Sequence, residues 1–178
     1  MITETDPKTE KLLGDYTELL FGIRRSVRYH TRRSRFFDLF HSITNAIGVI
    51  GGSSAIVTVL SGGGSSWTVL AAAIVTTSSA IDLVVGTATM ARLHSDLAKQ
   101  FIELEKDLIL AGDATDYTIR KFTARRLMIE AQEPPVLRSL DRLCHNELLR
   151  AMGYPNSDQV KIPLHHRALA HFISFDPK

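Results

Sequence analysis

The sequence contains one cysteine, Cys144, so an internal disulfide framework is excluded. It also has no P-loop, no GxGxxG dinucleotide motif, no HExxH zinc motif and no recognisable nucleophile motif. The adjacent pair Cys144 and His145 is not the signature of a catalytic dyad. We therefore expect a protein that is not an enzyme and that carries no cofactor.

The sequence also lacks the usual signals for binding a metal ion or nucleic acid. The closely spaced histidines are His165, His166 and His171, but adjacent histidines point to different faces of a helix, and no second ligand pair with a recognised spacing accompanies them. A net charge of +2 gives no strong general attraction to nucleic acid, and no aromatic platform accompanies the basic residues. We expect neither partner.

Formal charge is missing from the 43 positions between Leu39 and Ile81. The 22 residues from Leu39 to Leu60 suffice to cross a hydrocarbon core of about 30 Å. The 25 residues from Trp67 to Ala91 carry a single charge, Asp82, and are also long enough. Between them, Ser61-Gly-Gly-Gly-Ser-Ser66 favours a turn. The pattern predicts an all-α membrane protein with a two-transmembrane hairpin; a buried hairpin in a soluble helical protein is the alternative.

Arginines concentrate just before the first predicted span, whereas the Gly-rich loop carries no charge. Because basic residues stay on the cytoplasmic side and no signal peptide precedes the span, we expect both termini in the cytoplasm. Arginines on one helix face also suit anionic lipid headgroups, at about 1 kcal/mol each, although a topology signal alone would explain them. The candidate headgroup ligands are Arg24, Arg25, Arg28, Arg32 and Arg35.

Apolar residues spaced as in amphipathic helices flank both spans, at Leu12–Val27 before the first and Leu93–Leu108 after the second. Pairing Leu60 with Trp67 puts positions whose numbers sum to 127 at one height. We therefore expect residues 7–112 to form the hairpin and a cytoplasmic stalk, with helix ends near Asp6-Pro7 and Gly112-Asp113.

The remaining residues, 113–178, read as a cytoplasmic C-terminal region of short helices. Thr115–Gln132 is one predicted helix, Glu133-Pro134-Pro135 is a break, and Val136–Met152 is a second helix. A final segment, Ile162–Phe175, is suited either to dock against the stalk or to bind a partner.

Asp82 is the residue that most needs an explanation, because it falls about 22 Å below the outer interface and an unpaired carboxylate there costs about 2.5 kcal/mol or more. The sum of 127 places Asn45 at its level. Two readings stay open: Asp82 lines an ion pathway or a ring in an oligomer, or it pins the hairpin through a hydrogen bond to Asn45 or Thr44.

Small and hydroxylated residues fill both spans. Gly48 and Gly52 form a small-xxx-small pair that allows close helix contact, and Thr76 and Ser79 belong to a hydroxyl cluster in the second span. Helix packing is the favoured role for this cluster, and pore lining is the alternative. Two spans cannot enclose a pore alone, so a channel requires a homo-oligomer.

The residues quoted so far resemble the SLATT family, the SMODS and SLOG-associating two-transmembrane effector domains. The likeness lies in Arg24-Arg-Ser-Val-Arg-Tyr-His30 and Arg32-Arg-Ser-Arg-Phe-Phe37 before the first span, the Gly-rich turn, and the long helix carrying Arg92-Leu-His-Ser-Asp96. It covers roughly residues 12–112. The resemblance implies a bacterial inner-membrane effector triggered by a partner sensor.

Two functions are compatible with these patterns. The first is an effector that oligomerises through its hairpin and permeabilises or conducts ions across the bilayer, with a role in antiphage defence. The second is a non-conducting, membrane-anchored scaffold that binds a cytoplasmic sensor or regulatory protein through the stalk and C-terminal helices. Asp82→Asn separates them, because only the effector should lose function.

Overall fold

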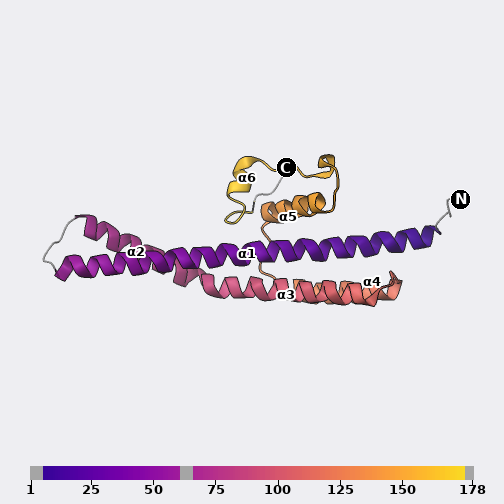
Figure 1. The fold of residues 1–178 in the computed structure, drawn as a ribbon, viewed down its shortest axis with the longest axis horizontal. Helices are drawn as coiled ribbons and strands as arrows, with labels where there is room; N and C mark the ends of the chain where they lie inside the picture. Colours follow the sequence, from indigo (N-terminus) through magenta and orange to yellow (C-terminus); the bar gives the residue numbers. More distant parts are fainter. Residues whose placement is uncertain (1–5, 61–65, 175–178) are drawn as a thin grey trace. The chain divides into compact units, whose positions relative to one another are not determined.

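The computed structural model describes residues 6–60 and 66–174, and every regular element within these ranges is helical (Figure 1). The elements are α1 (Pro7–Leu60), α2 (Ser66–Val85), α3 (Thr87–Ala111), α4 (Asp116–Glu130), α5 (Arg138–Ala151), a 3-10 turn (Asn156–Asp158) and α6 (Leu164–Ala168). The predicted all-α class is confirmed. The predicted Gly-rich turn lies outside the described residues, apart from Ser66.

The chain forms two compact units, one from residues 1–32 and 95–178 and the other from residues 33–94. The C-terminal helices therefore pack in the same unit as the first half of α1 and most of α3. This grouping differs from a division at residue 112, because α5 contacts α1 directly rather than forming a core of its own.

The predicted helix ends agree with the structure. Asp6 begins α1 by accepting a backbone hydrogen bond from Thr9, and Gly112 ends α3 with a φ of 74°. Thr115 caps α4 because its hydroxyl oxygen accepts the Thr118 N–H at 3.1 Å. Pro134 and Pro135 separate α4 from α5, as the sequence predicts.

The second predicted span is not one uninterrupted helix. Gly86 adopts a left-handed φ of 63° and separates α2 from α3, although the Gly86 N–H still bonds to the Asp82 carbonyl and the Met90 N–H to the Gly86 carbonyl. A register in which position numbers sum to 127 assumes two uninterrupted helices. Gly86 breaks that assumption, and the pairings below differ from it.

The core of the first unit follows the predicted stripes. Leu97, Phe101, Leu104 and Leu108 of α3 are fully buried, and Leu19 and Ile23 of α1 are buried with them. A second cluster joins Tyr29 of α1 to the α5 stripe and to the segment after α6, through Leu140, Cys144 and Ala170. These two clusters hold α3 and α5 against the first half of α1.

Candidate functional site

The hairpin of α1 and α2 in the second unit exposes apolar side chains that a water-soluble protein would bury. Trp67 is 78% exposed, and Leu83 and Val84 are exposed even more. Both helices are long and apolar enough to cross a membrane by length and composition, and hardly any of their apolar windows is buried. The other exposed apolar residues of the hairpin are Leu39, Ile43, Val49, Ile50, Ile56, Val57, Val69, Leu70, Ile74, Ile81 and Val85.

Small residues form the contact between the two helices of the hairpin. The partly buried residues of α2 recur at intervals of three and four, as in a helical seam: Thr68, Ala71, Val75, Ser78 and Asp82. Gly51 is the glycine that this seam requires, because a Cβ there would overlap the Val75 side chain. An open apolar cavity of about 370 Å³ lies beside this contact, lined by Ile43, Ile47 and Ile50 on α1 and by Ala71 and Ile74 on α2.

Gly48 and Gly52 do not serve this intramolecular contact. A Cβ built on either residue meets nothing within 4 Å, so neither is needed for α1 to approach α2. Thr76 and Ser79 are likewise exposed, outside the seam that contains Ser78. The roles predicted for these four residues in helix packing and pore lining therefore stay predictions.

Asp82 pairs with His41 and Thr87. The Asp82 carboxylate lies 3.1 Å from His41 Nδ1 and accepts a hydrogen bond from the Thr87 hydroxyl. Asn45 instead donates to His41 Nε2 at 3.0 Å, and the Thr44 hydroxyl donates to the His41 carbonyl at 2.9 Å. Asp82 therefore has its hydrogen-bonding partners one helical turn from the position that the equal-height register predicts.

The hydrogen bonds around His41 indicate the tautomer of its neutral ring. Because Nε2 lies beside the Asn45 amide nitrogen, which donates, Nδ1 is the nitrogen that donates toward Asp82. Thr87 is almost fully buried, whereas the side chains of His41 and Asp82 keep 37% and 20% of their surface. The cluster of His41, Asn45, Asp82 and Thr87, called here the polar cluster, is thus satisfied internally and open on one side.

Sequence reasoning missed His41 and Thr87 as partners of Asp82. A polar residue one turn before Asn45 on the same helix face is the signal that identifies His41. Thr87 follows the Gly86 break, so its approach to Asp82 depends on a backbone conformation that the sequence pattern alone does not give.

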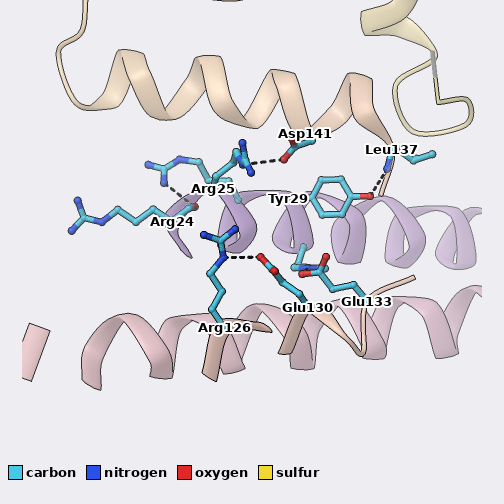
Figure 2. A network of polar contacts seen from close by, with 10 residues as sticks. Arg24, Arg25, Tyr29, Arg126, Glu130, Glu133, Leu137 and Asp141 are labelled. Carbon is cyan, nitrogen blue, oxygen red and sulfur yellow. Dashed lines mark hydrogen bonds and ion pairs between the residues drawn. The ribbon is translucent and has the colours of Figure 1, made fainter. Parts of the chain in front are cut away.

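Three of the five predicted headgroup arginines form ion pairs within the first unit. Arg24 contacts Glu105 of α3 at 2.7 Å, Arg25 lies 3.2 Å from Asp141 of α5, and Arg32 contacts Glu147 of α5 at 2.6 Å. Figure 2 shows Arg25 directed toward Asp141. Arg28 donates to the Arg24 carbonyl, and Arg35 is exposed. Arg24, Arg25 and Arg32 thus link α1 to its neighbouring helices.

A small polar cavity of about 260 Å³ lies between α1 and the segment joining α4 to α5 (Figure 2). The buried His30 ring stacks on Phe101 and its Nε2 lies 2.9 Å from Glu133. The Tyr29 hydroxyl oxygen accepts the Leu137 N–H at 3.0 Å. Arg25 faces Asp141, Glu130 faces Arg126 and Glu133 faces the His30 ring, so every ionisable group named in this lining has a polar partner at this junction between helices.

Other ionisable groups of the first unit are shifted by their surroundings. Burial raises the pKa of the Cys144 thiol to about 12, which keeps it protonated and unreactive. Burial also lowers the pKa of His145, and the hydrogen bond from Arg125 lowers the pKa of the Asp107 carboxyl. Within residues 6–60 and 66–174, no group of three or more His, Cys, Asp or Glu side chains is placed to hold a metal ion.

The hairpin with its polar cluster is therefore the most distinctive site of the described chain. No protein-family model matches the sequence, and no curated protein or solved structure is detectably similar to it.

Proposed function

We propose that the protein is a bacterial inner-membrane effector whose α1–α2 hairpin crosses the bilayer, assembles with further copies and lets ions pass. The observation that carries this proposal is a hairpin with exposed apolar side chains on both helices and a polar cluster open on one side. Lipid covers such an apolar surface, and an intramembrane carboxylate there faces protein or water. Both termini lie in the cytoplasm.

Assembly is needed because one hairpin cannot surround a pore. Gly48 and Gly52 are not used in the α1–α2 contact, and Thr76 and Ser79 are exposed beside it. Small residues support close contact between helices of neighbouring copies, while hydroxyls tolerate a water-filled path. In the assembly, Asp82 and Asn45 of each copy line that path, with His41 holding the carboxylate in position.

The resemblance to SLATT effectors supports the same function and adds a role in antiphage defence. A cytoplasmic sensor or regulatory protein then triggers the effector through the first unit, whose helices α4 and α5 contact α1 and α3 by ion pairs. Because these ion pairs join α5 to α1, a partner that moves α5 acts directly on α1.

The test is ion flux through liposomes that contain the purified full-length protein. We expect flux that falls at least tenfold in Asp82→Asn, with the same protein content per vesicle. Ser78→Ala is the matched control: among the described residues, the Ser78 hydroxyl bonds only to carbonyls of its own helix, so its removal should leave flux unchanged. Absence of flux in the wild type, with and without cell extract as the source of a trigger, would refute conduction.

A non-conducting scaffold is the second candidate, and the self-satisfied polar cluster favours it. In a scaffold, the bonds from Asp82 to His41 and Thr87 only pin the hairpin. Thr87→Val then lowers the thermal stability of the hairpin as much as Asp82→Asn does, without any loss of partner binding. Unequal effects of the two variants on flux at equal stability support the effector.

A further inference from the structure

We propose that the segment 159–174 of one copy docks into a groove on the first unit of a second copy, giving a head-to-tail contact between identical chains. The groove lies between α1 and the end of α5, has a volume of about 510 Å³ and is lined mainly by apolar groups. Leu13, Phe21, Leu149 and Tyr154 form its walls, and Glu10 and Glu18 are its only charged lining residues.

The acidic residues of the groove are available to a partner. Glu10 and Glu18 are both exposed, and among the described residues no basic side chain forms an ion pair with either. They stand eight residues apart on α1, which places them about 12 Å apart along the helix axis. Gly14 lies between them, and a Cβ on Gly14 would meet nothing within 4 Å. The groove is thus open at its centre and negative at both ends.

The segment 159–174 has the complementary character. It contains Lys161, Arg167 and three histidines but no acidic residue. Leu164 is 79% exposed, and Ile173 and Leu169 are exposed as well. Among the described residues, no carboxylate forms an ion pair with Lys161 or Arg167. An exposed leucine between two basic residues therefore matches an open apolar groove between two acidic ones.

The spacing of the charges allows this pairing. Lys161 precedes α6 by three residues and Arg167 lies within its single turn, so at most about 10 Å of chain and about 5 Å of helix rise join them. That length is sufficient to span the roughly 12 Å between Glu10 and Glu18. Leu164 can then enter the groove over Gly14 while Lys161 and Arg167 reach the two carboxylates.

The segment is held rigidly in its own copy, which lowers the entropic cost of docking. At its start, Asn146 exchanges two hydrogen bonds with the Val160 backbone, at 2.7 and 2.9 Å. Near its end, Ala170 is fully buried in the cluster with Tyr29, Leu140 and Cys144. Between these anchors, Lys161, Leu164 and Arg167 remain exposed.

Because groove and segment are different surfaces, the contact is heterologous and closes into a ring or continues as a filament. It is a second contact between copies, separate from the hairpin contact of the proposed function, on which its biological role rests, and it involves none of the residues of the polar cluster. Loss of the contact and loss of conduction can therefore be measured separately.

The test is a disulfide cross-link between two differently tagged full-length chains, co-expressed and held in native membranes. One chain carries Leu13→Cys and the other Leu164→Cys, both in a Cys144→Ala background. We expect the mixed dimer and at least tenfold less Leu13→Cys homodimer. Charge reversal of the groove by Glu10→Arg with Glu18→Arg, or of the segment by Lys161→Glu with Arg167→Glu, should reduce the mixed dimer tenfold, and combining both reversals should restore it.

Filling the groove provides a second, independent measurement. Gly14→Leu fits the fold because its Cβ position is open, so it should abolish the mixed dimer while Gly14→Ala preserves it. Glu103→Arg is the control for charge reversal, because Glu103 is exposed on the first unit and is not one of the residues that line the groove.

Three results would overturn the contact: no mixed dimer between the Leu13→Cys and Leu164→Cys chains without further changes, no restoration by the combined reversals, or insensitivity to Gly14→Leu. If the segment reversal instead only weakens binding to vesicles of anionic lipid, the segment faces a lipid surface and the contact is also overturned. A mixed dimer without ion flux refutes conduction alone, whereas flux without a mixed dimer refutes this contact alone.

Discussion

At the scale of single residues, the polar groups of this chain are explained by the partners that the fold gives them. An unpaired Asp82 carboxylate would be energetically costly within an apolar helix, but His41 and Thr87 supply its hydrogen bonds. Arg24, Arg25 and Arg32 read as a topology signal, and in the folded chain they also meet carboxylates of α3 and α5. These three arginines thus pack α1 against its neighbours, and their role in orienting the hairpin stays a prediction.

Cys144 provides the first prediction. Its folded-state pKa of about 12, against 9.0 in an exposed thiol, means that the unfolded state loses its proton at lower pH than the folded state. Stability therefore falls as pH rises from about 9 towards 12, by up to about 1.4 kcal/mol per pH unit. Denaturant titrations at pH 8, 10 and 11 measure the effect as the difference between wild type and Cys144→Ala.

A chemical control accompanies that titration. Iodoacetamide should leave Cys144 unmodified in the native protein at pH 8 and modify it fully in denaturant, whereas an exposed Ser157→Cys reacts in both. Native labelling of Cys144 at the rate of the exposed thiol would show that the α5 core opens freely.

At the scale of helices, features with a periodic pattern can be predicted from the sequence, whereas features that depend on contacts between distant residues cannot. The α3 stripe from Leu97 to Leu108 and the ends of α1 and α3 follow from apolar periodicity, proline and glycine. The register of the hairpin does not: His41 rather than Asn45 meets Asp82, and the left-handed Gly86 brings Thr87 to the same carboxylate. The ion pairs of the arginines join positions 81 or more apart, which spacing along one helix cannot show.

Two glycines of α1 give the second prediction. Gly14→Ala and Gly22→Ala both gain helix propensity, about 1 kcal/mol each. Nothing lies within 4 Å of a Cβ on Gly14, whereas a Cβ on Gly22 would overlap the Arg126 guanidinium and disturb its 2.6 Å contact with Glu130. Thermal unfolding should therefore show Gly14→Ala stabilised by about 1 kcal/mol, and Gly22→Ala stabilised less than that, because the Arg126 guanidinium must move away from its place beside Glu130. Equal stabilities would mean that Arg126 moves aside without cost.

At the scale of the whole molecule, the proposed membrane orientation sets which residues each aqueous compartment can reach. The arginine-rich segment before Leu39 and the uncharged Gly-rich loop predict the loop outside and both termini inside. Trp67, 78% exposed at the start of α2, then lies at the outer interface, while Ser157 lies in the cytoplasm.

The third prediction tests that orientation. In spheroplasts, a membrane-impermeant maleimide should label Trp67→Cys and leave Ser157→Cys unlabelled until the membrane is lysed, both in a Cys144→Ala background.

Reversing the basic excess by Arg24→Glu, Arg25→Glu and Arg28→Glu should weaken the preference for cytoplasmic termini, since basic residues resist translocation while acidic ones contribute little to topology. Labelling of Ser157→Cys in intact spheroplasts would invert the orientation. Equal labelling of both in the soluble fraction would show instead that the hairpin's apolar surface is covered by protein.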